Sequence, residues 1–260
     1  MKLKIFSLLV LAAAIMLSSC VSSQQRLAEQ REKDPQYQYD KAAVCMQYGL
    51  MDEAFKYLNQ ALTVDPRHYL SYNLLGLAHM MKGNLAEATK AFEKCVEINP
   101  NFSEAHNNLG MAYQESDALN KAEEEYKKAL AIDANYNASY NLAKLYYSKN
   151  QLDTALAYVQ KSLQKYNKSV LALNLQGLII EGQGKLDEAV ASYEQALRIA
   201  PDEQNVKFNL AVTYFKKEDF AKAKEILEKI LLALEKKSPN AQNADLKSKV
   251  NDLLSRIKLK

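Results

Sequence analysis

A period of about 34 residues runs through most of the chain and constrains its fold more than any other feature. Small residues recur at one position of this period: Ala54, Ala88, Ala122, Ala155, Ala189 and Ala223. A large apolar residue follows each by four positions: Leu58, Phe92, Tyr126, Val159, Tyr193 and Leu227. A second small series stands upstream: Ala42, Gly76, Gly110, Ala143, Gly177 and Ala211. Such a period is typical of a repeat architecture, in which each unit is one supersecondary element.

The repeating unit resembles the tetratricopeptide repeat, a helix–turn–helix element, and the clearest copy is YLSYNLLGLAHMMKGNLAEATKAFEKCVEINP at residues 69–100. The period gives six units: 35–68, 69–102, 103–135, 136–169, 170–203 and 204–237. Proline near the end of several units helps to end the second helix, because proline cannot continue a helix. One unit cannot bury its apolar face alone, so stacked units share a core. We therefore expect an all-α fold, a right-handed solenoid of six tetratricopeptide repeats (35–237) with a C-terminal capping helix.

Residues 238–260 are expected to cover the open C-terminal end of this array. The sequence SPN at 238–240 interrupts the last repeat, and an amphipathic segment follows it. Five apolar residues of that segment share one helical face, with Lys and Asp opposite: Leu246, Val250, Leu253, Leu254 and Ile257. With seven Gly, five Pro and no Trp, the composition also favours a mostly helical protein.

The N-terminal segment has the layout of a secretory signal peptide. Lys2 and Lys4 precede an uncharged run that ends at Leu17, and small residues follow it. This run is shorter than the roughly 20 residues that a membrane-spanning helix needs. A plain signal peptide over residues 1–19 would account for these features, and the next residue, Cys20, suggests a more specific one.

The sequence Leu-Ser-Ser-Cys at 17–20 resembles the lipobox of bacterial lipoproteins. In that family the cysteine carries a diacylglycerol, and the chain is cut before it and acylated. The resemblance implies a lipid anchor on Cys20 and a lipidated tether at residues 20–34. Val21 stands where an Asp would resemble an inner-membrane retention signal, so we expect an outer-membrane protein on the periplasmic side.

Charge and motif content argue against several other classes of function. Removing two lysines with the signal peptide from 34 basic residues leaves 32 against 31 acidic residues, which gives no general field to attract nucleic acid. The sequence has no phosphate-binding loop, dinucleotide fingerprint or nucleophile motif. We therefore expect no enzyme activity, no cofactor and no small-molecule substrate.

The histidines and cysteines are expected to be structural. His68 falls in a turn, and His79 and His106 occupy packing positions, so they form no cluster with metal-ligand spacing. Cys45 and Cys95 fall on helices of successive units that are not direct neighbours, which makes a disulfide between them implausible. We expect both to be ordinary buried thiols and expect no metal site.

In the tetratricopeptide family the first helices of the repeats line a concave surface that binds proteins. Carrying those positions over gives candidate partner-binding residues Asn73, Leu77, Met80, Met81, Asn107, Asn108, Met111, Asn141 and Tyr147. In the sixth repeat the same positions hold Phe208, Asn209, Val212 and Phe215. Amides can bond a peptide backbone, and methionine adapts to varied apolar side chains. Asparagine here is also common in the repeat consensus, so a purely structural role stays open for each one.

The whole chain resembles the lipoprotein pilotins of type IV pilus systems. The resemblance is carried by the lipobox, the six repeats, the cap, residues 34–84 and NPNFSEAHNNLG at 99–110, although family members often have Tyr where this chain has Leu109. It implies a protein partner, an outer-membrane secretin whose assembly the chain would assist. The alternative is a general periplasmic adaptor for envelope proteases or cell-wall enzymes.

A clamp for a C-terminal carboxylate is disfavoured on charge. Such clamps use basic residues at the second and sixth positions of a repeat. The third repeat has Glu104 and Asn108 at these positions, and the fourth has Asn137 and Asn141.

Overall fold

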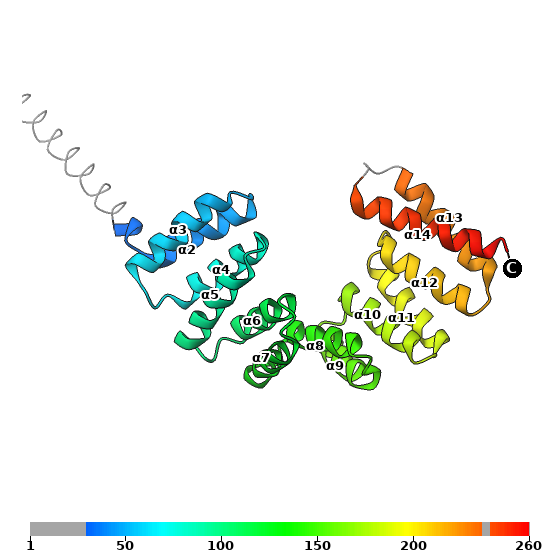
Figure 1. Ribbon diagram of the computed structural model, residues 1–260, viewed down its shortest axis with the longest axis horizontal. Coiled ribbons are helices and arrows are strands. Elements are labelled where there is room, and N and C mark those ends of the chain that lie inside the picture. The colour runs from blue at the N-terminus through cyan, green and yellow to red at the C-terminus, as the bar shows by residue number, and fades with distance from the viewer. Residues whose placement is uncertain (1–29, 236–239, 260) are drawn as a thin grey trace, which may run out of the picture. The chain divides into compact units, whose positions relative to one another are not determined.

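The computed structural model describes residues 30–235 and 240–259, which form helices α2 to α14 and contain no strand (Figure 1). The predicted signal peptide, Cys20 and most of the tether lie outside the described residues, as do residues 236–239, which span the predicted boundary between the last repeat and the cap. None of the helices within these ranges has the length and apolarity that crossing a bilayer requires.

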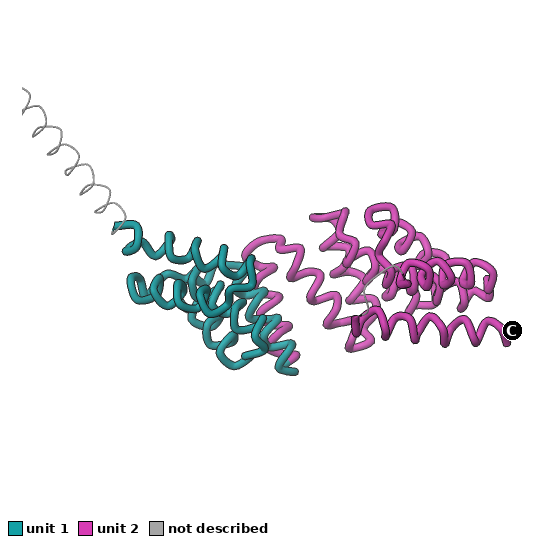
Figure 2. The backbone as a smooth tube through the Cα atoms, turned by 90° about the horizontal axis from the view of Figure 1, so that it is seen from above, with its two compact units in different colours: residues 1–118 teal, residues 119–260 magenta. Residues whose placement is uncertain are grey.

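The chain divides into two compact units, residues 1–118 and residues 119–260 (Figure 2). Unit 1 contains α2 (Pro35–Gln47), α3 (Met51–Val64), α4 (Tyr69–Met81), α5 (Leu85–Ile98) and α6 (Ser103–Glu115). Unit 2 contains α7 (Leu119–Ile132), α8 (Tyr136–Ser148), α9 (Leu152–Lys165), α10 (Val170–Gly182), α11 (Leu186–Ile199), α12 (Gln204–Lys216), α13 (Phe220–Glu235) and α14 (Ala241–Ile257). The sequence predicted one unbroken array, whereas this division falls between the two helices of the third repeat.

The helices form pairs of the tetratricopeptide type, which confirms the predicted all-α fold. The first helix of each pair begins at the first residue of a predicted repeat, at positions 35, 69, 103, 136, 170 and 204. Both small-residue series and the large apolar series are buried. The period therefore records which side chains lie between the two helices of a pair.

The turn inside each pair repeats one backbone conformation. The second residue after the first helix has a left-handed φ of 55 to 79° in all six pairs: Gly49, Gly83, Asp117, Asn150, Gly184 and Glu218. In the second pair the Gly83 N–H donates to the Met80 carbonyl and the Asn84 N–H to the His79 carbonyl, both at 2.9 Å. This arrangement satisfies the last carbonyls of the first helix and directs the chain into the second.

Polar bonds connect successive pairs at one recurring place. Lys82, at the end of α4, donates to Asp52 near the start of α3 at 2.9 Å. Gln183 bonds Asp153 at 2.8 Å in the same way, and Lys217 pairs with Asp187. Each bond joins the end of a first helix to the start of the preceding second helix, so it helps to set the register of neighbouring repeats.

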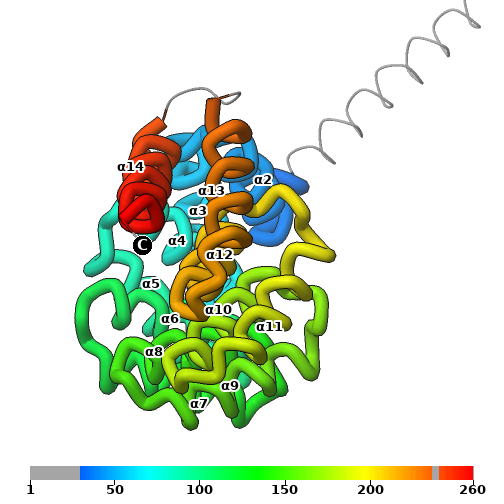
Figure 3. The backbone as a smooth tube through the Cα atoms, turned by 90° about the vertical axis from the view of Figure 1, so that its right-hand side faces the viewer, coloured from blue at the N-terminus to red at the C-terminus, as the bar shows by residue number. Residues whose placement is uncertain are grey.

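Helix α14 packs against α13 and α12 in unit 2, where the sequence predicts a cap (Figure 3). Leu246, Val250 and Leu253 are buried in a cluster with Leu227 and Ile230 of α13. Leu254 and Ile257 lie partly buried against the same cluster. The five residues of the predicted apolar face thus contact the last repeat.

Candidate protein-binding face

Seven of the candidate binding residues lie on two helices of unit 1, α4 and α6, which contact each other. These are the first helices of the second and third repeats. We call this surface the α4–α6 face: Asn73, Leu77, Met80, Met81, Asn107, Asn108 and Met111. The two remaining candidates, Asn141 and Tyr147, belong to α8 in unit 2.

The three asparagines of the α4–α6 face form a buried hydrogen-bonded group, each at most 6% exposed. Asn108 Nδ2 donates to Asn73 Oδ1 at 3.0 Å, which joins α6 to α4. Asn73 Nδ2 donates to Glu104 Oε1 at 3.2 Å, and Asn107 Nδ2 contacts Asn108 Oδ1 at 3.4 Å. Because buried amides need partners, these bonds stabilise the pairing of the two first helices.

The same bond occurs in unit 2. Asn209 Nδ2 of α12 donates to Asn174 Oδ1 of α10 at 2.9 Å, and these residues occupy the repeat positions of Asn108 and Asn73. Asn141 is also buried and is hydrogen-bonded, while Tyr147 is half-buried. The amide pair is therefore a feature of the repeat, which favours the structural role for Asn73 and Asn108.

The apolar part of the α4–α6 face is only partly open. Leu77 and Met80 are half-buried and pack against the cluster that contains Phe92 and Leu109. Met81, at the end of α4, is 65% exposed. The sequence predicted all three as partner-binding residues, but the packing concentrates the exposed apolar surface at Met81.

The fourth apolar candidate, Met111 in α6, is half-buried, and its Sδ lies 3.7 Å from Asn107 Nδ2. A thioether is a weak acceptor, so this contact constrains Met111 little. Methionine side chains are flexible, so that of Met111 can change its shape more readily than a branched apolar residue.

The histidines are held by local contacts. His68 Nδ1 lies 2.8 Å from Ser71 Oγ at the start of α4, and His106 Nε2 lies 3.0 Å from the Pro100 carbonyl. The His79 ring packs against Phe55, and burial lowers the pKa of His79. None of these side chains belongs to a group of three or more metal-ligating residues within the described ranges.

Both cysteines of the described residues are free thiols. Cys95 is completely buried in α5, and burial raises its pKa to about 12. Because the thiolate is the reactive form, a thiol held protonated is a poor nucleophile. Cys95 therefore behaves as a small apolar residue of the core.

One candidate surface was not recognised in the sequence. Polar residues Gln242, Asp245, Lys249, Asp252 and Arg256 of α14 follow a helical spacing, and they line pockets against α12. From the sequence, this polar stripe was predicted to be the solvent-facing side of the capping helix. The regular spacing of these residues was visible in the sequence. That they line pockets follows only from the packing of α14 beside α12.

Comparison with known families finds tetratricopeptide repeats over residues 35–124. Tetratricopeptide repeat families match residues 35–68, 69–102 and 91–124. Residues 133–243 match the C-terminal ARM domain of tetratricopeptide repeat protein 21. No curated protein matches the chain at a significant level.

Several solved structures share the fold. PilF of Pseudomonas aeruginosa is 24% identical, with a TM-score of 0.60 over 74% of this chain and 89% of PilF. PilW, described as a widely conserved type IV pilus biogenesis factor, is 17% identical, with a TM-score of 0.73 over 78% of this chain and 95% of PilW. YrrB, described as a tetratricopeptide protein with an unusual peptide-binding site, is 23% identical, with a TM-score of 0.54 over 66% and 89% of the two chains. At these identities the likeness establishes the fold alone.

Proposed function

We propose that the chain is an outer-membrane lipoprotein scaffold whose repeats bind a segment of a secretin and assist its assembly for type IV pilus biogenesis. A lipid on Cys20 holds it on the periplasmic side of the membrane. It acts by binding and positioning its partner, so it needs no cofactor. Tethering at the membrane raises the local concentration of scaffold beside a membrane-bound partner.

The observation that carries the binding role is the exposed Met81 beside half-buried Leu77, Met80 and Met111 on adjacent first helices. Exposed apolar surface between polar neighbours is typical of a protein-interaction site. Repeat arrays use such surfaces to bind extended segments of other proteins. The fold shared with PilF and PilW supports the choice of a pilus partner.

Site-directed photo-crosslinking tests the partner. A photoreactive amino acid at Met81 is expected to capture a secretin from outer membranes, and one at exposed Ala86 in α5 should not. Met81→Glu would place a charge where an apolar partner side chain is desolvated, a penalty of a few kcal/mol that weakens binding about a hundredfold. We choose Met81 because a charge at Met80 would also disturb the core around Phe92.

The expected phenotype of Met81→Glu is loss of secretin multimers and surface pili while the folded, lipidated protein remains. Ala86→Glu is the matched control and should change neither. Normal multimers in the Met81→Glu strain, or capture of an envelope protease or cell-wall enzyme in place of a secretin, would favour the general periplasmic adaptor.

The anchor is tested separately by intact mass. The mature protein should begin at Cys20 and carry acyl chains, and Cys20→Ala should yield a protein that salt washes from the membrane. A wild-type mass without acyl chains would remove the anchor from the proposal.

A further inference from the structure

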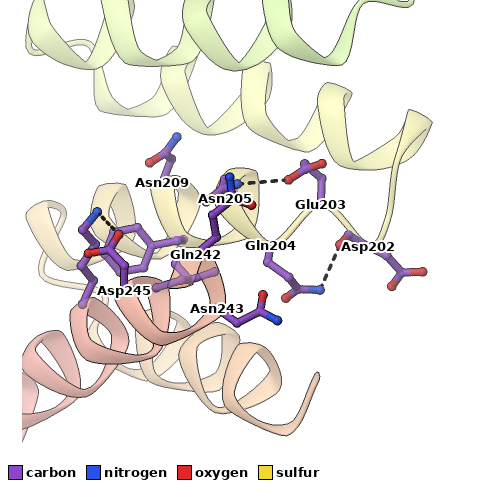
Figure 4. A pocket seen from close by; sticks show the side chains of 11 residues that line it. Asp202, Glu203, Gln204, Asn205, Asn209, Gln242, Asn243 and Asp245 are labelled. Carbon is purple, nitrogen blue, oxygen red and sulfur yellow. Dashed lines mark hydrogen bonds and ion pairs between the residues drawn. The ribbon is translucent and has the colours of Figure 1, made fainter. Parts of the chain in front are cut away.

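A groove runs between α12 and α14 in unit 2, whereas the α4–α6 face belongs to unit 1. It consists of two pockets, of 630 and 520 Å³, which share Phe208 and Lys249. The first pocket lies at the N-terminal ends of α12 and α14 (Figure 4). The second continues along both helices to Phe215 and Arg256. Volumes of this size are typical of ligand-binding sites.

The first pocket contains a buried acceptor without a partner. Gln204 lines this pocket and is only 6% exposed, and its Nε2 donates to the Asp202 carbonyl at 3.0 Å. That bond fixes the amide orientation, because the opposite orientation would place two carbonyl oxygens together. Gln204 Oε1 then has no hydrogen-bond partner among the described residues. Buried acceptors are normally satisfied, so this oxygen is an unmet hydrogen-bonding group in the wall of the pocket.

Amide side chains of both helices line the same pocket, and those of Asn205 and Asn209 already donate to Glu203 and Asn174. Asn205 and Asn209 contribute from α12, and Gln242 and Asn243 contribute from α14. Figure 4 shows these side chains projecting from both helices around the pocket. A carboxamide has two N–H donors and an acceptor oxygen, so the groups that are not used within the fold can bond a peptide main chain.

The outer edge of the first pocket is negatively charged. The Asp202 side chain is fully exposed, and Lys207 approaches it only to 3.9 Å. Glu203 contacts Asn205 at 3.4 Å, which leaves its charge in place. Asp245 is neutralised by Lys249 at 2.6 Å. Two carboxylates, Asp202 and Glu203, then face one nearby cation, Lys207, so this end keeps a net negative charge, which favours a cationic side chain.

The second pocket has an apolar wall. Phe208, Val212 and Phe215 line it from α12, and all three are half-buried. The cations around it already have partners within the chain. Lys216 bonds Glu181 at 2.5 Å, and Arg256 lies over the Phe215 ring at 5.0 Å from the ring centre. The feature that this end offers to a ligand is therefore the apolar surface.

We propose that the α12–α14 groove binds an extended peptide with a basic side chain beside Asp202 and Glu203 and an apolar side chain against Phe208, Val212 and Phe215. The groove follows α12 from Gln204 to Phe215, which is about 17 Å at 1.5 Å per residue. An extended chain covers that length with about five residues. This site is distinct from the α4–α6 face and does not depend on the identity of the partner bound there.

Fluorescence anisotropy with labelled synthetic hexapeptides tests the proposal on the soluble chain lacking residues 1–20. The probes are KKSSLL and LLSSKK, since the groove does not fix chain direction, with EESSLL, LLSSEE and KKSSSS for comparison. At least one of the first two should bind at least tenfold more tightly than the other three.

A charge reversal then distinguishes groove recognition from non-specific adhesion. The double variant Asp202→Lys, Glu203→Lys should bind the basic peptide at least tenfold more weakly than wild type and bind its glutamate counterpart more tightly. Glu228→Lys, at an exposed position of α13, is the charge control and should leave both affinities unchanged. Met81→Glu should also leave them unchanged, which separates this site from the α4–α6 face.

Three results would each overturn the proposal. One is that neither basic peptide binds more tightly than the comparison peptides. Another is that the reversed variant, folded by circular dichroism, keeps the wild-type preference. The last is that Met81→Glu removes the binding, which would assign the peptide to unit 1.

Discussion

A methyl group on Gly76 in α4 would lie 2.5 Å from Cε1 of Phe92 in α5, closer than packed carbon atoms approach. Tyr193 approaches Gly177 as closely in unit 2. Where the equivalent first-helix residue is Ala42, its partner is the smaller Leu58, and both lie in one buried cluster. In these repeats glycine on the first helix faces an aromatic residue 16 positions later, and alanine faces the smaller leucine.

Gly76→Ala should destabilise unit 1 by about 1–2 kcal/mol, because the added carbon overpacks the interface. Helix propensity alone would favour alanine by about 1 kcal/mol, so any loss reports the clash. Combining the change with Phe92→Leu, which recreates the Ala42–Leu58 pair, should restore part of the loss. Urea unfolding of the two single variants and the double variant measures this coupling.

Gly177→Ala with Tyr193→Leu is the matched experiment in unit 2 and should show coupling of the same sign. Strictly additive effects in both units would mean that these contacts do not set the size of the paired residues.

Glu218→Gly should stabilise unit 2 by about 0.5–1 kcal/mol. Glu218 has φ of 61° in the turn between α12 and α13. A side chain in this left-handed conformation costs about 1–2 kcal/mol, and the greater freedom of glycine in the unfolded chain offsets part of the gain. Thermal unfolding measures the change. Gly184→Ala, at the equivalent position with φ of 79°, should destabilise the unit; a Glu218→Gly variant that is less stable than wild type would contradict the argument.

Glu123 should stabilise unit 2 in a pH-dependent way. Its carboxylate accepts bonds from Lys127, from Lys149 just after α8 and from Tyr146 of α8, which lowers its pKa from 4.5 to about 2. Because the folded pKa is below the unfolded value, this stabilisation is complete above pH 4.5 and is lost as the pH falls to about 2.

Glu123→Gln should therefore unfold at lower urea than wild type at pH 7, by about 1 kcal/mol after screening by water. This difference in the free energy of unfolding between wild type and variant should disappear as the pH falls from 4.5 to 2. Glu124→Gln, an exposed neighbour that pairs with Lys128 at 3.0 Å, is the control and should change stability little. A difference that stays constant with pH would show that Glu123 acts by packing alone.

Leu253→Ala should destabilise the last repeat by about 2–4 kcal/mol, because it leaves a cavity between α14 and α13. Hydrogen exchange should increase first in the amides of α12 and α13, since each repeat depends mainly on its neighbours. Leu259→Ala, at a position 86% exposed, is the control. Unchanged exchange in α13 for the Leu253 variant would mean that α14 does not stabilise the repeat that it covers.

The secondary structure was predictable because it depends on local pattern repeated six times. Small and large apolar residues recur in phase, so Ala88 and Phe92 could be assigned to a helix interface without coordinates, and both are fully buried. The apolar face of the cap followed from spacing for the same reason. Period and amphipathicity are properties of the chain itself.

The binding residues were harder to assign, because exposure depends on how one repeat meets the next. Asn73 and Asn108 are 35 positions apart, and only the packing of α6 on α4 brings their amides to 3.0 Å. Met80 and Met81 are adjacent in sequence, yet one packs against the Phe92 cluster and the other is 65% exposed.

The sequence by itself determined the repeat, the helix pairs and the cap, since each follows from short-range periodicity and amphipathicity. The tertiary structure decided which amides are used within the fold, which apolar side chains reach the surface, and that the polar stripe of α14 faces α12 across a groove. Those outcomes depend on the register between helices, and register is set by the packing of side chains from distant positions in the chain.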